Sequence, residues 1–134
     1  MAEEYLRKSK HNEAFCKAIE EKFPGSFYDF KVVSLFYCAI HLLKYYCLQK
    51  FGAYVGDTHY AIKNNASPGS PVKIVSLPVG MWEEYLALYY ASKNARYAGI
   101  KNADAFEAAM KTEYTFSLGY LTRFKLYAKI EKPV

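Results

Sequence analysis

The sequence predicts an all-α protein in which helix exceeds about 65% of the residues and strand is nearly absent. Two observations carry this prediction. Four long segments repeat apolar side chains at intervals of three and four residues, which is the period of a helix. Proline and glycine separate these segments, and only 65–80 is proline-rich and long enough to be a loop. At 134 residues the chain is expected to form one domain, 1–134, around a single core.

The first two segments are predicted to be helices joined by a short turn. Residues 3–22 have an amphipathic pattern that a Pro-Gly pair ends. Ser26 then lies three residues before Asp29, a variant of the capping box, so the second helix is expected to start there and to run to about Lys50. Apolar residues occupy well over half of its circumference, which predicts a central helix that is buried almost all round. Gly52 closes it.

Three further helices follow. A short one is expected to begin at a cap formed by Asp57 or Thr58 and to end near Asn64. After the loop, the fourth helix is predicted over 81–98 and the fifth over 104–132. The apolar side chains of the fifth form one continuous line, which requires antiparallel neighbours to cover it.

The composition limits the compartment and the partners. Cys16, Cys38 and Cys47 fall inside helical segments without a CxxC pair, as expected for buried free thiols in a reducing compartment. The N-terminus lacks the pattern of a signal peptide, and the apolar run 32–43 is shorter than the roughly 20 residues of a membrane span. We therefore expect a soluble cytoplasmic protein. A net charge of +5 permits an acidic partner such as nucleic acid.

Two polar and aromatic stripes follow the same helical period. The stripe on the second helix comprises Ser34, Tyr37, Cys38, His41 and Tyr45. The stripe on the fourth comprises Tyr85, Tyr89, Ser92 or Lys93, and Arg96, with Asn94 and Tyr97 beside it. Burying a polar group without a partner costs about 1–3 kcal/mol, so the two stripes are expected to face each other.

Each candidate residue has more than one interpretation. His41 is expected to face the fourth helix near Tyr89 or Arg96, either as a hydrogen-bonded core histidine or on the wall of a cleft. Arg96 either caps the last carbonyls of its helix or contacts a ligand. His59 is either a surface residue or a weak candidate for acid–base chemistry.

Metal and cofactor chemistry have no motif in this chain. Cys38 and His41 have ligand spacing, but no second pair accompanies them, and HExxH, a phosphate loop and GxSxG are all absent. We expect neither a metal nor a cofactor.

The order of the motifs resembles the HEPN domain family of small helical proteins. The residues that carry the likeness are FYDFKVVSLFYCAIHLLKYY, THYAIKN and LYYASKNARYAG, followed by a long closing helix, over about residues 11–130. The resemblance implies an up-and-down bundle of four main helices plus one short helix, which is frequently a homodimer. It also implies association with a small nucleotidyltransferase, as in toxin–antitoxin pairs, and either RNA cleavage or nucleotide binding.

The chain departs from the RNA-cutting members at the catalytic motif. Those members carry an arginine followed after four to six residues by a histidine, whereas here the counterpart is Lys93-Asn94 with no histidine after it. Arg7 and His11 are too close in sequence and lie on the first helix. Catalytic activity is therefore uncertain. The favoured hypothesis is a nucleotide- or RNA-binding cleft between the second and fourth helices, with these ligand-binding residues: Tyr37, His41, Lys93, Asn94, Arg96 and Tyr97.

Two alternatives stay open. One is a metal-independent ribonuclease of the toxin type with a rearranged site, in which His41 or His59 is the acid or base and Arg96 stabilises the phosphate. The other is a purely structural subunit whose tyrosines form an interface.

Overall fold

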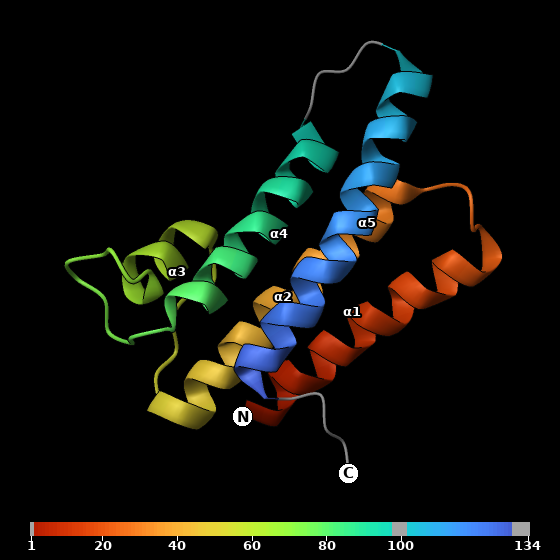
Figure 1. Ribbon diagram of the computed structural model, residues 1–134. Helices are drawn as coiled ribbons and strands as arrows, with labels where there is room; N and C mark the ends of the chain where they lie inside the picture. Colours follow the sequence, from red (N-terminus) through yellow and green to blue (C-terminus); the bar gives the residue numbers. More distant parts are fainter. Residues whose placement is uncertain (1, 98–101, 130–134) are drawn as a thin grey trace.

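The computed structural model describes residues 2–97 and 102–129 and is all-helical (Figure 1). Helix accounts for 79% of these residues, and none of them lies in a strand, which confirms that the protein is all-α. The five helices are α1 (Ala2–Lys22), α2 (Tyr28–Phe51), α3 (His59–Ala66), α4 (Val79–Tyr97) and α5 (Ala103–Ala128).

Helix α2 is the centre of the molecule. It packs against α1, α4 and α5, and α4 also packs against α5 (Figure 1). Side chains around its circumference are fully buried, among them Val32, Cys38 and Leu43, so the prediction of a central helix buried almost all round is confirmed. By length and composition α2 is also apolar enough to cross a membrane, and 61% of the apolar window that meets this criterion is buried inside the protein.

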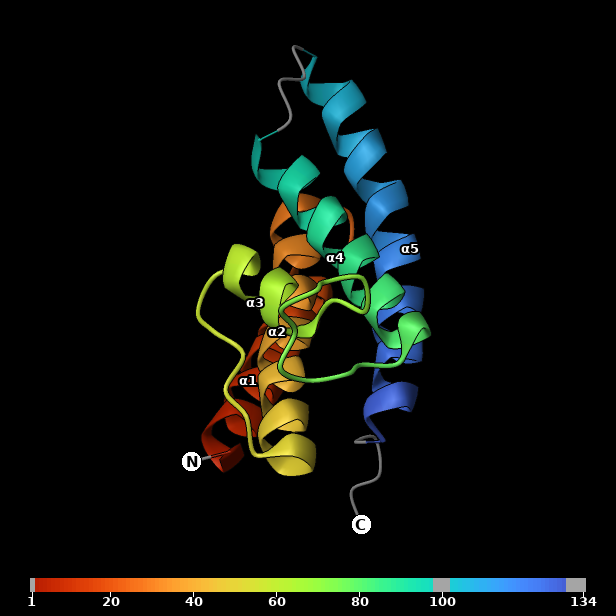
Figure 2. The same ribbon diagram turned by 90° about the vertical axis from the view of Figure 1, so that its left-hand side faces the viewer.

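Helix α3 and the loop that follows it lie to one side of the bundle, beside α4 (Figure 2). The Thr58 side chain caps α3 by accepting a hydrogen bond from Ala61 N at 3.1 Å. Of the two candidate caps, Asp57 and Thr58, the structure therefore uses Thr58. Ile62 and Ala66 of α3 are buried in the core, which fixes the rotation of this short helix and hence the direction of its first side chain, His59.

The start of α2 differs from the prediction. Its N-cap is Phe27, in the left-handed region at φ 58° and without a side-chain capping bond, so the proposed cap at Ser26 is wrong. The reason is the preceding turn. Ser26 N donates to Phe23 O at 3.2 Å, which closes a turn on the end of α1 and delays the start of α2 to Tyr28. The other end is as predicted, with Gly52 at φ 67° as C-cap.

Helices α4 and α5 approach each other closely where α4 begins. A Cβ atom placed on Gly80 would overlap the phenol of Tyr127, so a larger residue there would require the exposed Tyr127 side chain to move. Helix α5 begins after Asn102, whose side chain accepts from Ala105 N at 2.9 Å. It ends at Ala128 with Lys129 in the left-handed region, and the predicted end at Lys132 lies outside the described residues. The predicted end of α4 at Ala98 lies outside the described residues.

The interface between α1 and α2 buries polar groups. Lys31 is fully buried, forms an ion pair with Glu20 at 2.7 Å and donates to Phe23 O at 2.8 Å. Near the middle of α1, Ser9 donates to Cys38 O at 2.7 Å. All three cysteines are buried and free, which confirms that part of the prediction.

Candidate functional site

The centre of the candidate site is a stack of rings between α3 and α4. His59 opens α3, and its ring lies on Tyr89 with the centroids 3.6 Å apart and the planes inclined by 8°. His59 Nδ1 and the Tyr85 hydroxyl share a hydrogen bond of 2.9 Å, and Trp82 continues the array at 6.4 Å. Tyr85 is fully buried, whereas His59 and Tyr89 are partly exposed. The array therefore presents one supported, partly open aromatic face.

Helix α2 extends this array towards Arg96. The ring of Phe36 lies 5.9 Å from Tyr85 and 5.8 Å from Tyr89. The guanidinium carbon of Arg96 lies 6.0 Å from the centroid of Phe36, and Arg96 NH1 donates to the Tyr37 hydroxyl at 3.3 Å. Two helices thus hold the cation at the exposed edge of the aromatic cluster. The expectation that the stripes of the second and fourth helices face each other therefore holds at Tyr37 and Arg96. The binding role of both residues stays a prediction.

Lysines flank the histidine at the centre of the array. Burial lowers the pKa of His59, and the charges of Lys63 and Lys93 lower it further. Burial also raises the pKa of Tyr85. Both groups are therefore neutral at pH 7, and the positive charge of this face comes from Lys63, Lys93 and Arg96, with Lys93 and Arg96 both exposed. Such a face suits a flat, negatively charged ligand.

His41 does not join this cluster. Its ring lies 6.3 Å from Tyr5 of α1, and its neighbours in a hollow are residues of α1. The prediction that it faces α4 near Tyr89 or Arg96 is therefore wrong. The interpretation as a hydrogen-bonded core histidine also fails within the described part of the chain, because His41 Nδ1 is buried without a hydrogen-bond partner.

Helix geometry explains the correction. Successive residues of a helix are rotated by about 100°, so the predicted stripe on α2 is wide enough to touch two neighbouring helices. Tyr37 reaches Arg96 on α4, whereas Cys38 accompanies the contact with Ser9 on α1. His41 lies on the α1 side.

Two other candidates are not brought into the site. Asn94 Nδ2 donates to Glu113 of α5 at 3.3 Å, on the face of α4 opposite to the contacts that α4 makes with α3. Tyr97 ends α4, and its side chain lies outside the described residues. Lys93 is the one predicted neighbour of Arg96 whose charge acts on His59.

Sequence reasoning missed Phe36, Lys63 and Trp82. A signal for Trp82 was present, because Trp82, Tyr85 and Tyr89 recur at helical spacing, and His59 opens a short helix after a cap. No periodicity, however, indicates which helix will lie beside α3. Among residues 2–97 and 102–129 no group of three or more His, Cys, Asp or Glu side chains is arranged to hold a metal ion.

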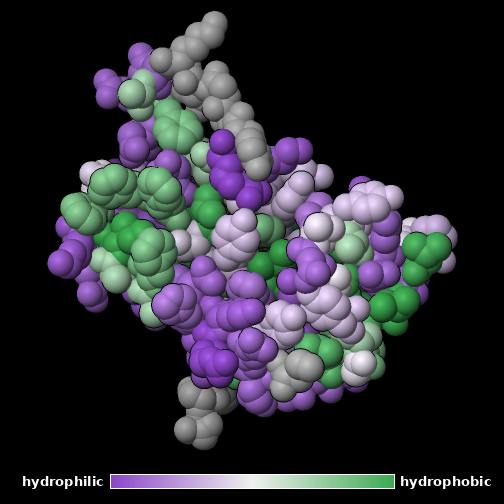
Figure 3. All heavy atoms as spheres, turned by 180° about the vertical axis from the view of Figure 1, so that it is seen from behind, coloured by the Kyte–Doolittle hydropathy of each residue, from purple (hydrophilic) through white to green (hydrophobic). Residues whose placement is uncertain are grey.

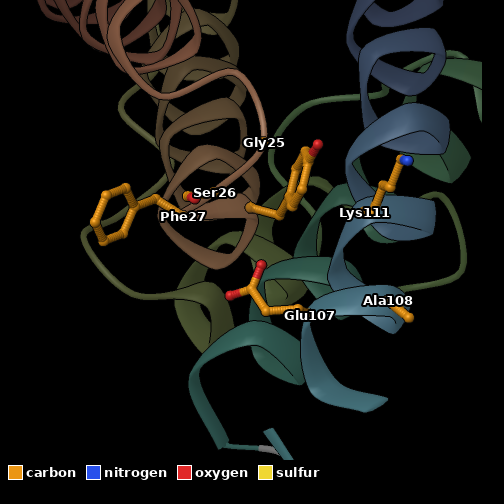
Figure 4. A pocket seen from close by; sticks show the side chains of 7 residues that line it. Gly25, Ser26, Phe27, Glu107, Ala108 and Lys111 are labelled. Atoms are coloured by element: carbon orange, nitrogen blue, oxygen red, sulfur yellow. The ribbon is translucent and has the colours of Figure 1, made fainter. Parts of the chain in front are cut away.

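A hollow of about 550 Å³ lies elsewhere, between the α1–α2 turn and α5 (Figure 4). Glu107 points from α5 towards this turn, and Phe27 points away from α5. The only charged side chains of its lining are Glu107 and Lys111, which carry opposite charges. It holds none of the predicted site residues, so it does not compete with the aromatic face.

Comparison of the chain with protein-family models, with curated proteins and with solved structures gave no match in any of the three. The likeness to HEPN domains thus stays a prediction from the order of its motifs.

Proposed function

We propose that this chain is an HEPN-like nucleotide- or RNA-binding protein, an up-and-down bundle of four main helices plus one short helix. The binding face runs from Arg96 over Tyr89 to His59, with the buried ring of Phe36 beneath it. The observation that carries the proposal is the continuity of these rings, bordered by cations at the Arg96 end and beside His59.

The chemistry of the face favours this ligand class. Proteins that bind single-stranded nucleic acid combine cations along the backbone with aromatic rings on which bases stack, each stack contributing about 1–3 kcal/mol. Here Arg96 and Lys93 take the phosphates and the partly exposed rings of Tyr89 and His59 take the base. The net charge of +5 adds long-range attraction for a polyanion.

The test is binding of a fluorescent single-stranded RNA and of a mononucleotide. Arg96→Ala is expected to weaken binding by about 1.5–3 kcal/mol, the range for a charge-assisted hydrogen bond, with a melting temperature within a few degrees of the parent. Lys111→Ala removes an exposed charge on α5 and serves as the matched control. A collapse in thermal stability with unchanged affinity at low temperature refutes the ligand role of Arg96 and makes it a structural tie.

Arg96→Lys separates two kinds of phosphate contact. Lysine keeps the charge but loses the planar fork, so binding survives if the site reads charge alone and falls if the contact is bidentate. Lys93→Ala is expected to weaken the binding of all RNA sequences by the same factor, because a phosphate contact carries no sequence information. The salt dependence of binding should fall by about one counterion.

The same samples test the ribonuclease alternative. His59 is held by Tyr85 and is neutral at pH 7, which is the protonation state that a general base requires. If the metal-free protein cleaves RNA and His59→Asn abolishes single-turnover cleavage even at saturating RNA, where weaker binding no longer limits the rate, the chain is a ribonuclease with a rearranged site. Absence of cleavage with intact binding favours the binding module.

Homodimer formation is part of the proposal, with a small nucleotidyltransferase as second partner. Hydrophobic side chains gather at the edge of the back face where α1 turns into α2 (Figure 3). Phe23, Phe27 and Phe30 are between 43% and 57% exposed there, and a two-fold contact would bury them. Sedimentation at tens of micromolar is expected to give a dimer. Phe30→Glu is expected to give a monomer.

A further inference from the structure

A second basic region lies on the α1 side of α2, away from Arg96. It is an open hollow of about 280 Å³ whose lining consists of Arg7, Lys8, His11, Asn12 and His41. Four of these five side chains are basic and none is acidic. Arg7 and His11, which lie one turn apart on α1, thus meet a histidine of the central helix.

The ring of Tyr5 organises the cations beside this hollow. Lys8 Nζ lies 5.3 Å and Lys44 Nζ lies 5.6 Å from the centroid of that ring, and the ring of His41 lies at 6.3 Å. Lys44 is only 7% exposed. Its further contact is with the Tyr54 ring at 5.7 Å, and within the described part of the chain it forms no hydrogen bond or ion pair.

These groups repel one another in the unliganded protein. Burial, followed by the charges of Lys44 and Lys8, lowers the pKa of His41 to about 4. Burial also lowers the pKa of Lys44, which Asp57 raises and Lys8 lowers. Asp57, which accepts a hydrogen bond from the Tyr54 hydroxyl, thus offsets part of the cost of burying Lys44 without forming an ion pair with it. An anion bound in the hollow would offset the positive charge that gathers there and relieve this repulsion.

We infer that the hollow between α1 and α2 binds a phosphate dianion, either as inorganic phosphate or as the terminal phosphate of a small phosphomonoester. Arg7 and Lys8 contact the phosphate oxygens, and His11 and His41 donate from their rings. Lys44, which lies against the Tyr5 ring and does not line the hollow, adds its charge. The volume lies just below the range of about 300–1,000 Å³ that is usual for pockets of drug-sized ligands, so a phosphate with a small remainder fits better than a whole oligonucleotide.

The doubly charged form is favoured over a phosphodiester because the ligand must offset several cations at once. Binding also favours the imidazolium of His41, since an opposite charge within about 4–6 Å favours the charged form of a side chain. Phosphate binding and protonation of His41 are therefore linked: each strengthens the other.

The test is a titration with inorganic phosphate at pH 7 and constant ionic strength, followed by the imidazole signals in NMR spectra. We expect saturable shifts of the His41 and His11 signals and a rise in the pKa of His41. Lys8→Met is expected to weaken binding about tenfold or more, whereas Lys10→Met removes an exposed charge from the same helix outside the hollow and leaves binding unchanged. Equal losses in both variants, or no saturable shift of His41, overturn the inference.

Two further ligands identify the source of the phosphate. Adenosine 5′-monophosphate that binds as well as inorganic phosphate, or better, identifies a phosphomonoester site. A dinucleotide with only an internal phosphodiester is expected to shift the His41 signal with a Kd at least about tenfold higher. Equal binding refutes the preference for a dianion. Arg96→Ala leaves the phosphate titration unchanged, so this site and the proposed RNA face fail or succeed separately.

Discussion

The two buried lysines of α2 lie at opposite ends of its contact with α1 and have different surroundings. Lys31 has a carboxylate at 2.7 Å, a backbone carbonyl at 2.8 Å and the ring of Tyr28 at 4.6 Å. Lys44 has two rings and another lysine nearby, and no hydrogen bond or ion pair in the described part of the protein. One end of the interface holds a buried lysine in an ion pair, and the other holds a buried lysine without one, although the charge of Asp57 acts on it.

This difference separates a structural role from a binding role. A buried charge with a full set of partners ties two helices together, and removing it leaves those partners without their bond. A buried charge without such partners costs free energy of folding, and a bound anion would offset that cost. We therefore assign Lys31 to the fold and Lys44 to the inferred phosphate site.

The largest effect on stability is expected at the Lys31 end of the interface. Lys31→Met should lower the free energy of unfolding by about 2–3 kcal/mol, because the Phe23 carbonyl loses its donor. The loss stays at the lower end of the range for broken buried pairs because Glu20 is 42% exposed and regains water. Urea denaturation measures it, with exposed Lys22→Met as control. Equal stability of the two variants would contradict a structural role.

A smaller loss is expected midway between the two lysines. Ser9→Ala removes the buried hydrogen bond to Cys38 O and should lower the free energy of unfolding by about 1 kcal/mol. The same denaturation measurement applies. A loss as large as that of Lys31→Met would mean that the ion pair adds nothing beyond an ordinary hydrogen bond.

At the Lys44 end of the interface, the substitution should change the free energy of unfolding in the opposite direction. Without phosphate, Lys44→Met is expected to leave stability unchanged or to raise it by up to about 1 kcal/mol, because an apolar side chain of similar length replaces a buried charge without an ion pair. In phosphate buffer the parent should gain stability and the variant should gain less. A loss of 2 kcal/mol or more in phosphate-free buffer would mean that Lys44, like Lys31, has a structural role.

The smallest effect is expected from His41, near Lys44, on the pH dependence of the free energy of unfolding. The pKa of His41 is about 4 in the folded protein, against 6.5 ordinarily, so between these values the unfolded chain binds more protons and stability falls as the pH falls. The ring is partly exposed, so we expect His41 to account for less than about 1 kcal/mol. Urea midpoints from pH 7 to 4 should fall less steeply for His41→Asn. Parallel slopes would exclude His41.

The sequence predicted the helices well because each has its own period and its own end signals. The central position of α2, the cap at Thr58 and the burial of Cys16, Cys38 and Cys47 all follow from local pattern. The cap at Ser26 failed because a turn closing on α1 competed with the capping box.

The candidate site was predicted only in part. The two stripes face each other at Tyr37 and Arg96, but His41 turns to α1, and His59 joins the array through Tyr89. Periodicity fixes which side chains share a face of one helix and leaves open which neighbour covers that face. That choice depends on the connections, and here α3 and the loop after it lie beside α4 (Figure 2).

The burial of α2 by later helices has a consequence for synthesis. Helix α2 is apolar enough to resemble a membrane span, yet α4 and α5, two of the three helices that cover it, are translated after it. At about 5–20 residues per second, Ala128 leaves the ribosome several seconds after Phe51. During that interval the nascent chain exposes an uncovered hydrophobic helix with only α1 to pair with. Chaperones that bind such segments have this window in which to act, and a ribosome that stalls before α5 releases a product prone to aggregation.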